Sequence, residues 1–248
     1  MLKYIDIHNH ILFGLDDGPK SIMESMKMID MAAKEGIKII VATPHVCPGK
    51  KIFDHIQYSL ALDQLNSYCA AKAYGLQIVG GAEIKWNENT IRLLRQGLVP
   101  TMNNTRFVLV EWSASSRYED ICNSLRELTN AGYKVICSHV ERYRSLYKRR
   151  AIDSIVEAYD VRIQVDVDAI LGNAPLRTRL FVRRLLKRHL VDYVATDAHN
   201  IRSRPVQMHE AYDVLLNQCG RNYARSLTRD NAKELFRDGA AHENKRRS

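Results

Sequence analysis

The chain has 248 residues, of which 46% are hydrophobic and 26% are charged, the composition of a globular protein. It contains no apolar run long enough to span a membrane, and the N-terminal stretch turns polar too early to form a secretory signal. We therefore expect no membrane span and a cytoplasmic location. The formal net charge of +9 would suit a nucleic-acid partner, but no helix-turn-helix, zinc-finger or aromatic RNA-binding signature is present. The charge is better explained by an anionic substrate or an acidic partner surface, and we expect no nucleic-acid partner.

The five cysteines are scattered and include no CxxC pair. An odd and dispersed set argues against a disulfide framework and against a zinc–thiolate site. We expect reduced cysteines that serve mainly as packing residues.

Short apolar runs alternate with longer stretches of helical period along the whole chain. The predicted strands are 4–7, 38–42, 77–81, 107–111, 134–137, 161–165 and 192–195. The predicted helices are 22–35, 54–74, 87–96, 117–131, 144–159, 175–189, 205–219 and 228–238. About seven β-then-α units without a linker predict an α/β fold, with a barrel favoured over an open sheet. We expect one domain over residues 1–248, in which the polar segment 239–248 is a frayed tail.

Histidines and acidic residues follow six of the seven predicted strands, at the rim where parallel barrels build their sites. The sequence DIHNH places His8 and His10 after the first strand, and Asp16 and Asp17 lie in the next turn. The later strands lead to His45, Glu83, Glu111, His139, Asp197 and His199. The other four histidines, at 55, 189, 209 and 242, fall within predicted helices or the tail.

This set joins five imidazoles with four carboxylates, which is too many ligands for one ion. Mixed nitrogen and oxygen donors without sulfur suit Mn²⁺, Fe or Zn²⁺ and argue against Mg²⁺ or Ca²⁺. Two or three neighbouring ions bridged by carboxylates are an arrangement used for the hydrolysis of phosphate esters. The donor types leave the choice between zinc and manganese open.

The ordered motifs resemble the polymerase-and-histidinol-phosphatase (PHP) superfamily of metallophosphoesterases. The segments DIHNHILFGLDDGPKS, VATPHV, GAEI, SHVERY, LGN and ATDAHN are similar to its bacterial branch of capsule and exopolysaccharide tyrosine-protein phosphatases. The resemblance runs from about residue 3 to residue 238.

The resemblance implies a distorted, TIM-like (β/α)₇ barrel with a trinuclear site that usually holds manganese. One metal would be bound by His8, His10, Glu83 and Asp197. A second would share Glu83 and add Glu111 and His139. A third would be bound by Asp17, His45 and His199.

The resemblance also implies that Arg142 and Arg204 bind the substrate phosphate, a role that suits the planar fork of guanidinium. One departure lies beside Arg142, because Val140 replaces the proline usual in the family and frees a backbone N–H. Cys137 is a second departure, at a position where the family more often has a small or apolar residue.

Together these features predict a metal-dependent protein-tyrosine phosphatase that uses a metal-activated water. The expected substrate is a phosphotyrosine-containing protein, in this family's pathway the tail of a bacterial tyrosine kinase that controls capsule or exopolysaccharide synthesis. The alternatives are a small-molecule phosphatase of the histidinol-phosphate type, a catalytically idle regulator and a nuclease. A cysteine-dependent phosphatase is disfavoured although CGRNYAR has the C-x₅-R spacing, because Cys219 ends a predicted helix instead of lying in a phosphate-binding loop.

Overall fold

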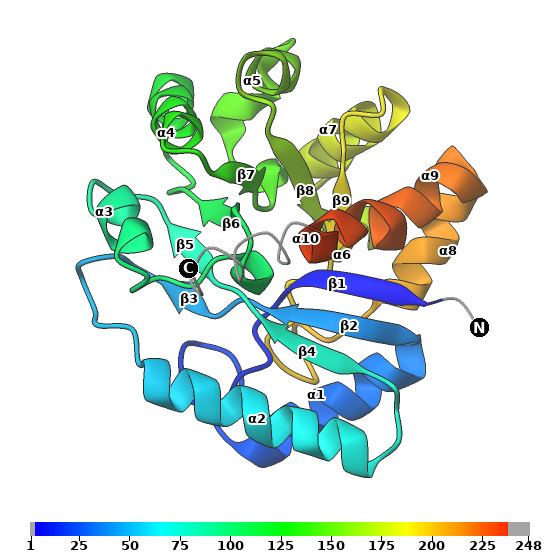
Figure 1. Ribbon diagram of the computed structural model, residues 1–248. Coiled ribbons are helices and arrows are strands. Elements are labelled where there is room, and N and C mark those ends of the chain that lie inside the picture. The colour runs from blue at the N-terminus through cyan, green and yellow to red at the C-terminus, as the bar shows by residue number, and fades with distance from the viewer. Residues whose placement is uncertain (1–2, 238–248) are drawn as a thin grey trace.

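The computed structural model describes residues 3–237 and shows an α/β fold with helices outside a curled parallel sheet (Figure 1). The predicted frayed tail at 239–248, and with it His242, lies outside the described residues. Among the described residues, no helix combines the length and the apolar character needed to cross a membrane.

The described strands pair in parallel in two sets. The first set has the order β1-β2-β4 and the second has the order β3-β5-β6-β7-β8-β9. Their bounds are β1 Tyr4–Asn9, β2 Ile37–Ala42, β3 His45–Val46, β4 Gln77–Gly80, β5 Glu83–Lys85, β6 Phe107–Glu111, β7 Lys134–Cys137, β8 Arg162–Asp166 and β9 Tyr193–Ala195. A parallel bridge between Asn9 and Ala198 brings β1 beside the chain that follows β9.

The two sets are connected because β2 and β4 are each interrupted and then resume as β3 and β5. Ala42 pairs with Gly80 and His45 pairs with Glu83, so the register between the two strands is the same before and after the break. Pro44 has no N–H to donate to a ladder, and a Cβ on Gly81 would lie 2.8 Å from the Val41 side chain. β3 therefore prolongs β2, β5 prolongs β4, and the strands follow one another as in a distorted barrel, as predicted.

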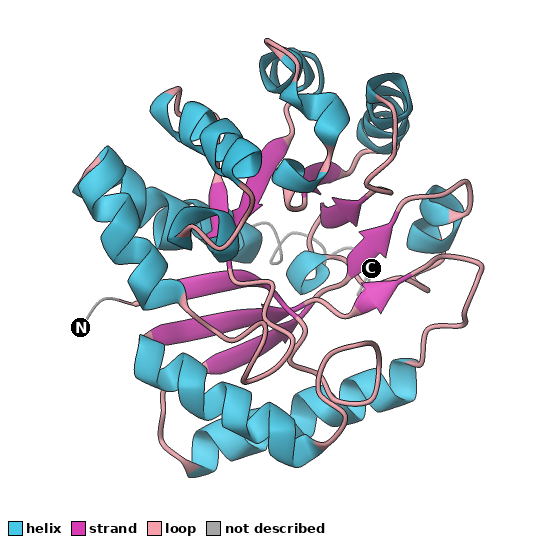
Figure 2. Ribbon diagram, turned by 180° about the vertical axis from the view of Figure 1, so that it is seen from behind, coloured by secondary structure: helices cyan, strands magenta, loops and turns pink. Residues whose placement is uncertain are grey.

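The helices cover the outside of the sheet (Figures 1 and 2). Their bounds are α1 Ile22–Glu35, α2 His55–Ala71, α3 Thr90–Arg95, α4 Tyr118–Asn130, α5 Ala151–Tyr159, α6 Val167–Leu171, α7 Leu176–Lys187, α8 Met208–Cys219, α9 Arg221–Arg225 and α10 Glu234–Arg237. Short 3-10 turns span Met102–Asn104, Val140–Arg142, Arg144–Tyr147 and Asn231–Lys233, and a π-helical turn spans Ser226–Asp230.

Two helix predictions were wrong in their extent. The segment 144–159 is a 3-10 turn followed by α5, because Arg150 adopts a left-handed backbone with φ 64° and interrupts the helix. Of the segment 228–238, Glu234–Arg237 is α-helical, and the residues before it form the π-helical and 3-10 turns. The short α6 and the short strands β3 and β5 were not predicted.

The interior of the barrel is a separate apolar cluster that the C-terminal helical segment closes. Ile7, Leu109, Ile136 and Tyr193 are buried there with residues of neighbouring strands, and Leu235 of α10 packs against them. A larger cluster fills the space between the sheet and the outer helices. The polar side chains described below lie at the carboxyl ends of the strands, as in other parallel barrels.

Candidate metal centre

Four buried donor atoms meet where β1, β5 and β9 come together. His8 lies near the end of β1, His10 follows that strand, Glu83 begins β5 and Asp197 follows β9. His8 Nε2 lies 3.2 Å from Glu83 Oε2, 3.3 Å from Asp197 Oδ1 and 3.2 Å from His10 Nε2. His10 Nε2 lies 3.4 Å from the same Glu83 oxygen and 3.2 Å from the same Asp197 oxygen.

This spacing fits a bound cation. Four atoms separated in this way surround a point about 2 Å from each, which is the length of zinc–imidazole and zinc–carboxylate bonds. Oδ1 of Asp197 is buried without a hydrogen-bond partner among the described residues, although it lies near both imidazoles. An unpaired buried carboxylate oxygen is costly unless a cation is bound to it.

Two further groups of donors adjoin the first. His45, Glu83 and Glu111 form one, with His45 Nδ1 3.0 Å from Glu83 Oε2 and 3.4 Å from Glu111 Oε1. His139 Nε2 lies 2.6 Å from the other oxygen of Glu83. Glu83 therefore contacts donors of two groups, as a bridging carboxylate would.

The third group is His10, Asp17, His45 and His199. Asp17 Oδ1 lies 3.5 Å from His45 Nε2 and 3.4 Å from His199 Nε2, and the latter nitrogen is buried without a hydrogen-bond partner among the described residues. The Asp17 side chain is 62% exposed, so this group faces the mouth of the site.

Two of these residues hold left-handed backbone conformations, His139 with φ 29° and Asp197 with φ 50°. Such conformations are unfavourable for residues other than glycine and persist where the surrounding structure fixes them. At Asp197 the fixing contact is a hydrogen bond of 2.9 Å from its backbone N to His8 O.

Sequence reasoning missed the residues that orient the candidate ligands. Asp16 accepts a hydrogen bond of 2.7 Å from His10 Nδ1, and Gln164 Oε1 lies 3.2 Å from His8 Nδ1 and accepts one of 2.8 Å from His139 N. The Tyr143 hydroxyl lies 3.1 Å from His139 Nδ1. In each case the nitrogen that faces away from the centre is engaged, which leaves Nε2 directed toward it. The position of Asp16 in LDDG was visible in the sequence, but nothing in the sequence indicated Gln164.

The electrostatics favour a cation. Burial alone would raise the pKa of Glu83, but His8, His139 and His10 outweigh it and hold this pKa well below its usual range. The pKa of His10 is raised well above its usual range, because the nearby carboxylates of Asp16, Asp197 and Glu83 overcome the opposing effect of burial. Without a metal the centre therefore attracts protons, and a divalent cation would displace them on binding.

Arg142 and Arg204 lie beside this centre. Both donate to Asp197 Oδ2, and Arg142 also donates to Asp166 Oδ2 at 2.7 Å. Val140 is buried in the core, and Arg142 reaches the centre although proline is absent at that position.

A cavity of about 750 Å³ opens over the centre. Its lining includes four basic residues, Arg142, Arg204, Lys51 and Lys85, and four acidic ones, Asp16, Asp17, Asp54 and Glu111. Leu15, Val46, Ile52 and Phe53 supply apolar surface.

All nine predicted metal ligands and both predicted arginines thus lie together at one end of the barrel. Their assignment as ligands and phosphate-binding groups stays a prediction. His45 and Glu83 follow β2 and β4 as predicted, and in addition they begin the short strands β3 and β5.

Cys219 lies elsewhere and is the last residue of α8. Its thiol donates to Leu215 O at 3.0 Å, and burial raises its pKa. Arg225, six residues on, is bound to Asp230 at 2.5 Å. The C-x₅-R spacing therefore forms no phosphate-binding loop with a thiolate.

A parallel barrel with histidine and carboxylate clusters at its carboxyl rim is the architecture of a barrel-type metal-dependent hydrolase. The chain belongs to the capsular polysaccharide synthesis family CpsB/CapC, whose family model matches residues 4–237.

Named relatives agree with this membership. The chain is 32% identical over 241 residues to the tyrosine-protein phosphatase CpsB of Streptococcus pneumoniae, covering 94% of this chain and 98% of the relative. It is 29% identical over 236 residues to the tyrosine-protein phosphatase YwqE of Bacillus subtilis, covering 94% and 92% of the two chains.

Solved structures agree as well. A structure from work on YwqE of Bacillus subtilis and CpsB of Streptococcus pneumoniae, metal-dependent tyrosine phosphatases, has a TM-score of 0.85 at 28% identity over 94% of each chain. A zinc-containing histidinol phosphate phosphatase of Lactococcus lactis has a TM-score of 0.56 at 15% identity, covering 88% of this chain and 94% of that chain, which is a likeness of fold alone.

Proposed function

We propose that this chain is a single-domain, metal-dependent protein-tyrosine phosphatase. The observation that carries the proposal is a donor set of imidazole and carboxylate groups that meet at Glu83 beside two arginines. Its membership of a family with named tyrosine phosphatases supports the same function.

In this proposal the first metal is held by His8, His10, Glu83 and Asp197, the second by Glu83, Glu111 and His139, and the third by Asp17, His45 and His199. When bound, two or three such ions lower the pKa of a water molecule and neutralise charge on the phosphate. Mn²⁺ is the metal we propose, on the family resemblance described above, and the donor types also suit Fe or Zn²⁺.

The protein's own groups bind and orient the phosphate. Arg142 and Arg204 each offer a planar pair of N–H donors at the mouth of the centre, where a phosphate would replace the shared oxygen of Asp197 as their partner. Asp16 and Gln164 fix the rings of His10 and His8, so the site needs little rearrangement when substrate binds.

The apolar side of the cavity favours an aromatic ester. The Phe53 ring packs against the rings of His55 and Tyr58, at centroid distances of 5.0 and 5.1 Å, so it is held in place at the wall. A phenyl ring bound next to Phe53 would bury more apolar area than histidinol, which carries a polar imidazole and a charged ammonium group.

The partner we propose is a phosphotyrosine-containing protein, within capsule or exopolysaccharide synthesis the tail of a bacterial tyrosine kinase. A protein with this substrate would act in the cytoplasm. The four basic residues of the cavity lining, Lys51, Lys85, Arg142 and Arg204, suit an acidic, phosphorylated segment.

The test is phosphate release by the Mn²⁺-loaded protein from a phosphotyrosine peptide, a phosphoserine peptide of the same sequence and histidinol phosphate. We expect the phosphotyrosine peptide to have the highest kcat/KM, and Phe53→Ala to reduce that preference by about tenfold through a higher KM. A preference for histidinol phosphate would instead place the function in small-molecule metabolism. No release from any of the three would contradict phosphatase activity.

A further inference from the structure

Two more cavities continue from the metal centre along the segment 142–150. One, of about 860 Å³, shares Arg142 with the metal cavity. The other, of about 360 Å³, shares Lys148 with the first. Neighbouring cavities in this series thus share a lining side chain, and the series runs from the candidate metal centre to the space between α5 and α7.

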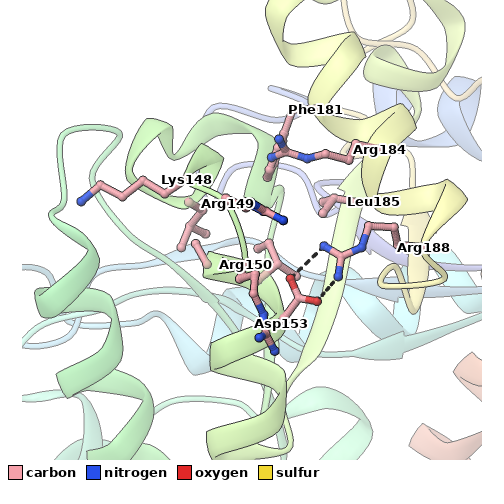
Figure 3. A pocket seen from close by; sticks show the side chains of 11 residues that line it. Lys148, Arg149, Arg150, Asp153, Phe181, Arg184, Leu185 and Arg188 are labelled. Carbon is pink, nitrogen blue, oxygen red and sulfur yellow. Dashed lines mark hydrogen bonds and ion pairs between the residues drawn. The ribbon is translucent and has the colours of Figure 1, made fainter.

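The far cavity, of 360 Å³, is strongly basic and is hereafter the basic cavity. Lys148, Arg149, Arg150, Arg184 and Arg188 line it, and Asp153 is its only acidic lining residue among those described (Figure 3). Arg188 binds Asp153 through both guanidinium nitrogens, one of these contacts measuring 2.9 Å, and this hydrogen bonding lowers the pKa of Asp153. The single carboxylate of the basic cavity is therefore already neutralised.

Part of the remaining positive charge is available to a ligand, because Arg150 is paired with Glu157 at 3.4 Å but other cations are not paired. The side chains of Lys148 and Arg149 are exposed and make no hydrogen bond or ion pair with any residue of the described range 3–237. Arg144 lines the middle cavity, and its exposed side chain also has no partner among residues 3–237. Three unpaired cations along one path favour an anionic ligand of matching length.

The floor beneath these charges is packed and fixed. The Tyr147 and Phe181 rings stack with centroids 4.1 Å apart. The guanidinium of Arg184 lies 5.3 Å from the Phe181 ring centre, and it donates to Tyr147 O at 3.0 Å. Leu146 and Leu185 are buried in the core beneath. Arg184 is thus held in position, which reduces the entropy lost when it binds an anion.

We infer that the basic cavity is a second subsite for the substrate of the metal centre, and that it binds a further phosphate or carboxylate of the same acidic peptide. The inference rests on the proposed function, because one phosphotyrosine must occupy the metal centre while a second anionic group reaches the basic cavity. The path through Arg142, Arg144 and Lys148 is the route along which the peptide lies. The subsite would make the protein prefer multiply phosphorylated segments to isolated phosphotyrosines.

The experiment compares three kinds of peptide on the Mn²⁺-loaded protein. The first has a single phosphotyrosine and neutral flanks. The second kind is a set with a second phosphotyrosine at increasing separation, and the third is the same set with glutamates in place of the second phosphotyrosine. The test variant is Lys148→Ala/Arg149→Ala. The matched control is Arg183→Ala/Lys187→Ala, which removes two exposed positive charges from α7 outside every cavity named above. Equal Tm values would show that both variants fold as the parent does.

We expect the parent to favour the best doubly phosphorylated peptide over the single one by about tenfold in kcat/KM, the scale of one or two charge-assisted contacts at a surface. The test variant should lose this preference through a higher KM and keep the parent's kcat/KM on the single phosphotyrosine, while the control keeps the preference. If the glutamate peptides are preferred over the single phosphotyrosine as strongly as the doubly phosphorylated peptides are, the subsite binds carboxylates as well as phosphates.

Equal preference in the parent and the test variant, or equal loss in both variants, would overturn the subsite and leave the proposed function standing. A parent that releases phosphate from no peptide would contradict the proposed function instead. In that case fluorescence anisotropy with the same peptides still decides the subsite, because tighter binding of the doubly phosphorylated peptide should be lost only in the test variant.

Discussion

Arg142 and Arg204 donate to one and the same oxygen, Oδ2 of Asp197. The other oxygen of that carboxylate faces His8 and His10 at 3.3 and 3.2 Å. Asp197 therefore divides its two oxygens between the candidate metal centre and the two arginines. This sharing places two guanidinium groups next to the candidate metal centre.

The first prediction concerns the shape of Arg142. Arg142→Lys retains the charge but loses the planar guanidinium, whose Nη2 contacts both Asp166 and Asp197 and whose fork would bind phosphate. We expect kcat/KM on a phosphotyrosine peptide to fall by about a hundredfold, with an unchanged Tm. Arg126→Lys, an exposed change on α4, is the control and should have no effect. Parent-like turnover by the Arg142 variant would contradict a role of Arg142 in phosphate binding.

The second prediction concerns Asp16, whose two oxygens both accept hydrogen bonds. Oδ1 accepts from Gly18 N at 2.9 Å, and Oδ2 accepts from His10 Nδ1 at 2.7 Å and from His45 N at 2.9 Å. Asp16→Asn would turn an NH₂ group toward one of these donors. We expect the Mn²⁺ concentration for half-maximal activity to rise by about 10- to 100-fold, the usual effect of losing a group that orients a metal ligand.

For this second prediction the control is Asp63→Asn, an exposed change on α2. Saturating Mn²⁺ should restore most of the kcat of Asp16→Asn, because Asp16 orients a ligand and is not one in our assignment. A loss of kcat that saturating metal does not restore would mean that Asp16 acts on the substrate directly.

These two residues show what the sequence could and could not predict. Arg142 and the nine candidate ligands lie at or after the carboxyl ends of predicted strands, and a parallel arrangement brings these ends to one rim whatever the intervening helices do. Asp16 was noted in the same turn as Asp17, but its role in orienting His10 was not predicted. Gln164 could not, because its contact with His8 depends on two strands that are 156 positions apart in the chain.

The strand breaks were hidden for a related reason. Residues 43–44 and 81–82 interrupt two strands whose pairing continues in the same register on the far side. A local pattern shows an apolar run ending there, and only the pairing of His45 with Glu83 shows that the strands resume. The helix prediction at 144–159 failed because the left-handed turn at Arg150 leaves no mark in the hydrophobic period.

The third prediction concerns the thiol mechanism. Burial raises the pKa of Cys219, and its sulfur is bound to the carbonyl of Leu215, so it is not a nucleophilic thiolate at neutral pH. Cys219→Ala should retain parent-like phosphate release, and iodoacetamide should not inactivate the parent through this residue. Loss of turnover in a folded Cys219→Ala variant would revive a cysteine-dependent mechanism.

The fourth prediction is a pH dependence of stability that arises away from the centre. Burial raises the pKa of Asp192 to about 6, while its Oδ2 accepts a hydrogen bond of 2.8 Å from Ile163 N. In the unfolded chain this carboxyl ionises near pH 4. Between about pH 4 and pH 6 the folded state therefore holds the proton that the unfolded state has released, and stability falls as the pH rises.

Asp192→Asn removes this dependence and can still accept the hydrogen bond from Ile163 N. The free energy of unfolding, measured with urea, should change between pH 4 and pH 7 in both proteins. We expect this change to be more favourable in the variant than in the parent by up to about 2 kcal/mol. Parallel stability curves for the two proteins from pH 4 to pH 7 would show that Asp192 titrates normally.

The most direct measurement is a titration of metal-stripped protein with Mn²⁺, following phosphate release from a phosphotyrosine peptide against equivalents of metal added. We predict no release from the stripped protein, then release that rises and reaches a plateau at about two to three equivalents per chain. Full release in the presence of excess chelator would contradict a metal-dependent mechanism. A plateau at one equivalent would contradict the multinuclear centre that the shared position of Glu83 indicates.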